Sequence, residues 1–100
     1  MDQPPDVLTL DHFLPLVGRT FAVDGSTDEP PFSLVEAKPI TTPEYPGRLR
    51  EAFALTFEAE TAVPEQGSRS FDLPGIGATE IFLVPSARRG PTIVYEAVFN

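Results

Sequence analysis

A chain of 100 residues without cysteine has room for one small core, and it excludes a disulfide scaffold, a thiolate metal site and a cysteine nucleophile. Its net charge of −8, from 15 acidic and 7 basic residues, repels nucleic acid and anionic membranes, so neither is expected as a partner. The apolar fraction of 41% is sufficient for a folded core, and no apolar run is long enough for a membrane helix.

The chain is expected to be a flexible N-terminal tail over residues 1–8 and a single β-barrel domain over residues 9–100. Its first residues, MDQPPDVLTL, lack the basic region and the long apolar region of a secretory signal. We therefore expect synthesis in the cytoplasm, and something other than such a signal to carry the protein to any other location.

A short helix is predicted directly after the tail. Thr9 is a candidate N-cap, and Pro15 limits the helix to one or two turns that end by Gly18. The apolar residues recur at helical spacing: Leu10, Phe13, Leu14 and Val17.

The rest of the chain is divided by prolines into windows, because proline lacks the N–H group that a sheet ladder needs. Each window contains one run with strand character. These runs are 19–23, 32–38, 52–60, 68–73, 79–84 and 93–99. The pattern predicts an all-β fold: a small six-stranded antiparallel barrel, or a barrel-like sandwich, with a short N-terminal helix.

The third run, AFALTFEAE, alternates most clearly, with Phe53, Leu55, Phe57 and Ala59 expected to face the core. The last two runs are apolar on both faces, and such strands need cover on both faces. The N-terminal helix is the expected cover of the second face. Without it, this face is an exposed interface, and the terminal strand is open to strand addition. With the helix as cover, the last strand is expected to lie centrally in the sheet and to close the barrel; in the alternative it is an edge strand.

Few residues suggest catalysis or metal binding. Glu58 and Glu60 share one strand face, about 7 Å apart, which suits an acid–base pair but also an ordinary solvated face. The segment DGSTDE carries side-chain oxygens at Asp24, Ser26 and Asp28, a spacing that calcium-binding loops use. It lacks the twelve-residue pattern of such a loop, so a hairpin turn explains the segment better. His12 is the only imidazole, and the sequence contains no Gly-x-Ser-x-Gly motif whose serine it could activate as a base. No enzyme, metal or cofactor is therefore expected.

Five residues are candidates for binding a partner. Arg88 and Arg89, in PSARRG, are a basic tip on an acidic protein, and such charges can contact an acidic partner or simply maintain solubility. Tyr45, Arg48 and Arg50 lie in the long connection ITTPEYPGRLRE. Long loops are often functional, and Tyr and Arg are enriched at interface hot spots, although a plain connector is the alternative.

Five strings of the sequence look familiar: FLPLVGRTF, FSLVEA, FALTF, GIGATEIFLVPSA and the terminal YEAVFN. They resemble an uncharacterised family of small bacterial domains of unknown function, which we associate with gene neighbourhoods encoding phage-tail-collar-like fibre proteins. The family's Gln-Gly step into the fourth strand is matched by Gln66 and Gly67. The aromatic and His that many members carry later in this strand are replaced here by Arg69, Ser70, Phe71 and Leu73. The resemblance implies the β fold and an accessory role beside surface fibres, as part of an extracellular or phage-like assembly.

The expected function is a non-enzymatic structural or interaction module, an accessory or assembly subunit of a phage-tail-like or surface-fibre system. Its expected partner is a fibre-like or tail-like neighbouring gene product, and self-association through the C-terminal hairpin is a further possibility. The alternative is a small-ligand-binding β-barrel. That alternative needs an empty interior, which four aromatic residues are expected to fill: Phe21, Phe53, Phe57 and Phe99.

Overall fold

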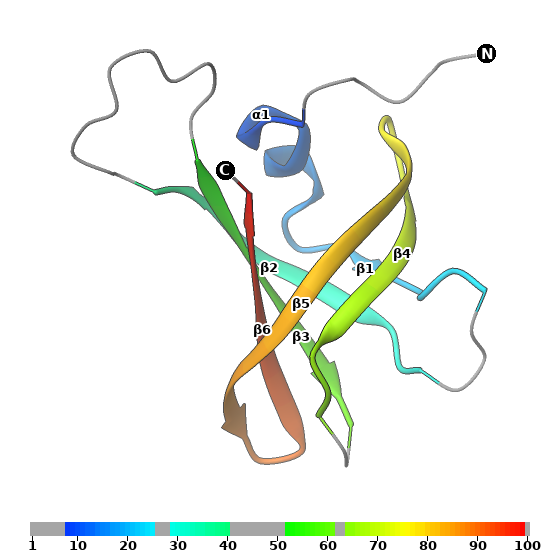
Figure 1. The fold of residues 1–100 in the computed structure, drawn as a ribbon, viewed down its shortest axis with the longest axis vertical. Helices are drawn as coiled ribbons and strands as arrows, with labels where there is room; N and C mark the ends of the chain where they lie inside the picture. Colours follow the sequence, from blue (N-terminus) through cyan, green and yellow to red (C-terminus); the bar gives the residue numbers. More distant parts are fainter. Residues whose placement is uncertain (1–7, 26–28, 41–51, 62–63, 100) are drawn as a thin grey trace.

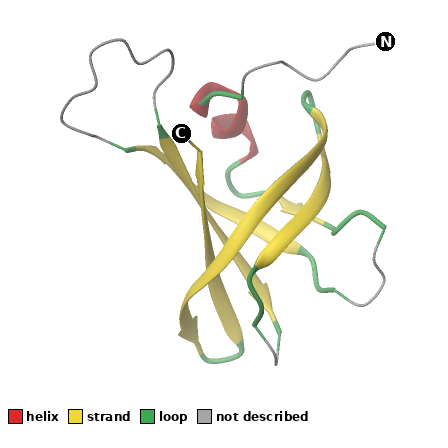
Figure 2. Cartoon of the chain, viewed as in Figure 1, coloured by secondary structure: helices red, strands yellow, loops and turns green. Residues whose placement is uncertain are grey.

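The computed structural model describes residues 8–25, 29–40, 52–61 and 64–99, whose six strands form a nearly closed antiparallel barrel (Figure 1, Figure 2). The elements are α1 (Leu10–Phe13), the 3-10 helix η1 (Leu14–Leu16), β1 (Thr20–Phe21), β2 (Phe32–Pro39), β3 (Phe53–Glu60), β4 (Gly67–Leu73), β5 (Gly77–Arg89) and β6 (Thr92–Phe99). The strand order is β1-β2-β3-β6-β5-β4. The predicted all-β barrel with a short helix is confirmed, and β6 lies centrally, between β3 and β5.

The barrel closes between β1 and β4. The backbone N–H of Asp24 donates to the carbonyl of Ser70 at 2.7 Å. β1 pairs with β2 over only two residues, Thr20 and Phe21, so the first predicted strand is shorter than expected. The chain leaves β2 after Phe21 because it crosses to β4, and this crossing provides the closing contact.

The core fills the barrel with aromatic rings in two clusters. β3 alternates as predicted, and its four inward side chains are all buried: Phe53, Leu55, Phe57 and Ala59. In one cluster Phe53 stacks on Phe99, with ring centroids 4.8 Å apart, and Phe13 lies within 5.7 Å of both rings. The second cluster contains Phe32, Phe57, Phe71 and Tyr95.

The N-terminal helix closes one end of the barrel. Figure 1 shows α1 beside the C-terminal end of β6, and Phe13 and Leu16 are buried there. The prediction that this helix covers the outer faces of the last two strands is wrong, since Phe82 is 52% exposed and Val98 57% exposed. α1 is only four residues long before η1 begins, so its few apolar side chains cover the end of the barrel. They leave the outer face of β5 and β6 uncovered.

β5 is longer than the sequence predicts. It continues through Pro85 to Arg89, although we expected proline to end the strand at Val84. The register of β5 against β6 shifts between Pro85 and Ala87, and a bulge is one of the places where a sheet accepts proline. The turn to β6 is therefore only Gly90 and Pro91, and Gly90 has a φ of 61°, a conformation that glycine adopts without strain.

No helix in the described part of the chain combines the length and the apolar character that crossing a bilayer requires.

Candidate functional site

The predicted basic tip lies on a strand end and is partly neutralised. Arg89 forms a salt bridge and a hydrogen bond with Glu58 of β3. Arg88 donates a long hydrogen bond of 3.4 Å to the carbonyl of Gly90. The structure therefore leaves Arg88 as the more available cation at this tip. The other three candidates, Tyr45, Arg48 and Arg50, lie outside the described residues.

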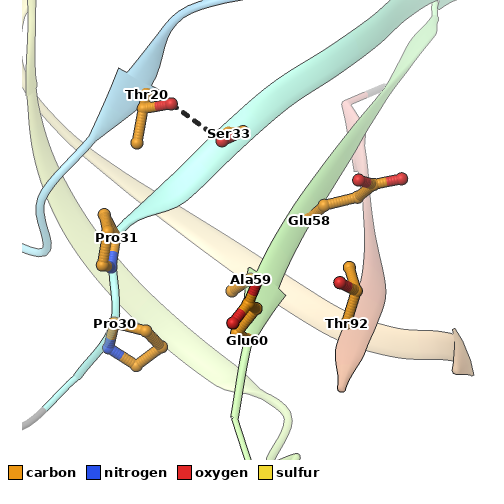
Figure 3. Close-up of a pocket in the computed structure, with 8 residues that line it drawn as sticks. All are labelled: Thr20, Pro30, Pro31, Ser33, Glu58, Ala59, Glu60 and Thr92. Carbon is orange, nitrogen blue, oxygen red and sulfur yellow. Dashed lines mark hydrogen bonds between the residues drawn. The ribbon is translucent and has the colours of Figure 1, made fainter. Parts of the chain in front are cut away.

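An open groove of about 460 Å³ lies on the outer face of the sheet (Figure 3). Glu58, the partner of Arg89, is one of its lining residues. Its lining consists of Thr20, Pro30, Pro31, Ser33, Glu58, Ala59, Glu60 and Thr92. The hydroxyl groups of Thr20 and Ser33 are hydrogen-bonded to each other at 2.8 Å, as the dashed line in Figure 3 marks. In register, Thr20 faces Ser33 and Ser33 faces Glu58, so these polar side chains form a row across three strands.

This groove does not provide the geometry of a carboxylate acid–base pair. Glu58 and Glu60 do share the outward face of β3, but the Glu58 carboxylate is bound to Arg89. The groove is also open to solvent rather than dry. Among the described residues, no group of three or more His, Cys, Asp or Glu side chains could hold a metal ion.

His12 has a structural role in the helix cap. Its Nδ1 accepts the backbone N–H of Thr9 at 3.0 Å, and the Thr9 hydroxyl lies 3.1 Å from the same nitrogen. Thr9 is the N-cap of α1, as predicted. The only imidazole of the chain thus satisfies a backbone donor at the start of the helix.

The strongest polar constellation in the described chain is centred on Arg69, which the sequence analysis did not single out as a site. Arg69 Nε lies 3.0 and 3.1 Å from the two carboxylate oxygens of Glu29. Its other nitrogens donate to the carbonyls of Gly67 at 3.3 Å and Glu65 at 2.9 Å. The guanidinium is buried inside the barrel, with Cζ 5.1 Å from the Phe32 ring centroid and 5.3 Å from that of Tyr95.

Arg69 therefore joins β4 to one segment that is distant in sequence and to one that directly precedes the strand. It connects β4 to the segment before β2 through Glu29 and to the segment before β4 through Glu65. A signal was present in the sequence, because Arg69, Phe71 and Leu73 alternate on one face of β4 and all three are buried.

Of the DGSTDE loop, Ser26 and Asp28 lie outside the described residues.

A second groove, apolar and of about 280 Å³, lies where β5 and β6 separate. Its lining consists of Glu80, Ile81, Phe82, Val84, Glu96, Ala97, Val98 and Phe99. Phe82 and Val98 are more than half exposed, and Val84 is 39% exposed. The face that the sequence identified as apolar is thus an open surface within the described chain.

Taken together, the fold and these surfaces define a small all-β barrel with an interior filled by side chains and with its grooves on the outside. The chain belongs to a family known as DUF6916, a domain of unknown function, whose model matches residues 8–99. Neither the curated proteins nor the solved structures contain a match.

Proposed function

We propose that this protein is a non-enzymatic interaction module that serves as an accessory or assembly subunit of a phage-tail-like or surface-fibre system. The observation that carries the proposal is the open apolar groove between β5 and β6. Phe82, Val84 and Val98 gather there on the outer face of the sheet. Contiguous exposed apolar surface is typical of protein interfaces, because water contact with it is unfavourable.

The state of the interior favours this proposal over a small-ligand-binding barrel. Six aromatic side chains are among the residues less than 2% exposed: Phe13, Phe32, Phe53, Phe57, Phe71 and Tyr95. A barrel that binds a ligand inside needs an empty interior of several hundred cubic ångströms. Here the described grooves of comparable size lie on the outer surface.

The contacts of the polar groups also favour an interaction module over an enzyme. His12 caps α1, Glu58 binds Arg89, and Glu29 binds Arg69. His12, Glu58 and Glu29 are thereby each engaged in a contact within the fold. The fibre context of the proposal rests on the resemblance to small bacterial domains whose gene neighbours encode phage-tail-collar-like fibre proteins.

Co-expression with the fibre-like product of the neighbouring gene tests the proposal. We expect the tagged protein to purify together with this product, at a defined stoichiometry by size-exclusion chromatography with light scattering. Failure of the two proteins to co-purify, combined with a small molecule that raises the melting temperature, would favour the ligand-binding alternative.

Two charge reversals locate the contact. Arg88→Glu changes the basic tip, and Lys38→Glu, at an exposed position of β2, is the matched control. Loss of the complex with Arg88→Glu alone places the contact at the tip. An unchanged complex with both variants moves the contact to another surface.

A further inference from the structure

We infer that the apolar groove between β5 and β6 binds an extended segment of a partner protein by β-strand addition, and that this segment carries basic residues beside apolar ones. The inference rests on the proposed interaction function and specifies how the contact is made. It draws on three features of the groove: unpaired strand edges, exposed apolar side chains and two carboxylates.

The first feature is a pair of strand edges without a partner. β5 pairs with β6 only from Val84 to Arg89, and the preceding part of β5 pairs with β4 instead. At the end of β6, residues 97–99 pair with β3 on one side only. Continued pairing would bring Phe82 opposite Val98, but within the described chain the two strands separate there, as Figure 1 shows. The backbone groups along these edges can therefore pair with an added strand.

The second feature is the side-chain surface beside the edges. Phe82 and Val98 flank the separation of the strands, and Val84 lies at its closed end. In an added strand every second side chain faces outward, beside Phe82 and Val98. Apolar side chains at those positions would remove this surface from water and give the segment its specificity.

The third feature is the charge at the groove, which determines the occupant. Glu80 and Glu96 line it, both are exposed, and neither forms a salt bridge with another described residue. Lysine or arginine in the added segment would face these carboxylates. A second copy of this chain would instead bring Glu80 and Glu96 close to their own counterparts, on a molecule whose net charge is already −8. The charges therefore favour a basic segment of another protein.

A synthetic peptide tests the inference directly. The probe is a fluorescein-labelled peptide of about ten residues that alternates valine with lysine and threonine, and binding is followed by fluorescence anisotropy. Two matched peptides are the controls: one has glutamate in place of lysine, and one has a central proline that removes a backbone donor. We expect the lysine peptide to bind at least about tenfold more tightly than either control, and about 0.5 M NaCl to weaken its binding.

Variants of the protein place the contact. Val98→Asp should weaken binding of the lysine peptide at least about tenfold, whereas Leu14→Asp should not. Leu14 is a suitable control because it is 46% exposed and lies on the helical segment rather than at the groove. Far-UV circular dichroism and thermal melting verify that both variants remain folded.

Each result has a distinct meaning. Equal binding of the lysine and glutamate peptides, or full binding by Val98→Asp, would overturn the inference. A dimer of the unmodified protein in sedimentation experiments, with Val98→Asp monomeric, would make a second copy the occupant and also overturn it. Peptide binding as expected, without co-purification of the fibre-like neighbour, would support the groove and refute the proposed fibre role. Co-purification of the fibre-like neighbour that Val98→Asp leaves unaffected would support the proposed fibre role and refute the groove as the contact.

Discussion

Replacing Arg69 by methionine should destabilise the barrel by about 2–3 kcal/mol, because the change removes the guanidinium while retaining most of the packing of the side-chain stem. The guanidinium makes hydrogen bonds to the carbonyls of Glu65 and Gly67, and it lies over two aromatic rings. Charged hydrogen bonds contribute about 1.5–3 kcal/mol each, and a buried cation–π contact up to about 2 kcal/mol. The expected net loss is smaller than these contributions together, because the Glu29 side chain is 35% exposed and its carboxylate can regain water.

The assay is urea unfolding, followed by far-UV circular dichroism and by tyrosine fluorescence. The chain has no Trp and only two Tyr, and Tyr95 is buried beside Arg69, so its emission reports the local environment. For a domain of this size, a loss of about 2–3 kcal/mol corresponds to a fall in Tm of about 8–24 °C.

Two further variants separate charge from geometry. Arg69→Lys retains the charge but loses the planar group that contacts Glu29, Glu65 and Gly67 together, so it should recover less than half of the loss. Glu29→Gln should lower the stability by only about 1 kcal/mol, because this side chain is partly exposed. If Arg69→Met were within about 0.5 kcal/mol of the unmodified protein, packing alone would explain the buried position, and the reasoning would be refuted.

Three other perturbations probe the remaining parts of the structure. Phe13→Ala should lower the free energy of unfolding by about 3–5 kcal/mol, measured by urea titration, since the ring is 1% exposed; a loss below about 1 kcal/mol would show that the helix does not close the core. Deletion of residues 92–100 removes the strand between β3 and β5 and should abolish cooperative thermal unfolding, so a cooperative melt of the truncated protein would contradict the topology. Glu58→Gln should change the stability by less than about 1 kcal/mol, because its partner Arg89 is largely exposed, and a larger loss in the same titration would show that the groove of Figure 3 stabilises the fold.

The class of fold could be predicted from the sequence because two independent patterns agreed. The alternation of β3 placed Phe53 and its three inward neighbours correctly, and the six proline-free windows each contained one strand. The short helix was also predicted correctly, from a cap at Thr9 and a limit at Pro15. These features depend on local chemistry, which the order of residues expresses directly.

The length of β5 could not be predicted in the same way. Pro85 ends a strand in most sheets, but a register shift beside it allows pairing with β6 to continue. Such a bulge depends on two strands that meet only in the folded chain. Arg88 and Arg89 were consequently assigned to a loop, and the partner Glu58, 31 residues earlier, was not foreseen.

Arg69 was missed for a related reason. An arginine in a strand is normally read as an outward residue, and its burial depends on acceptors and rings from separate segments. Glu29 is 40 residues away along the chain, and Tyr95 lies on a strand that does not pair with β4. Side chains alternate along a strand, so the inward positions of Phe71 and Leu73 nevertheless placed Arg69 on the inward face. An arginine in phase with buried residues is thus an indication of an internal ion pair.

β5 and β6 carry apolar residues on both faces, and the explanation is that β5 pairs with β4 along one part of its length and with β6 along the other. Up to Leu83 it pairs with β4, and from Val84 it pairs with β6, so the two strands separate while both remain part of one sheet. The sequence correctly placed an apolar face at Phe82 and Val98 but assigned its cover to a helix that closes the barrel end instead. The apolar residues and the unpaired strand edges thereby coincide at one place on the surface. This coincidence is what strand addition requires, because backbone pairing alone is weakly selective and apolar burial alone does not fix the register.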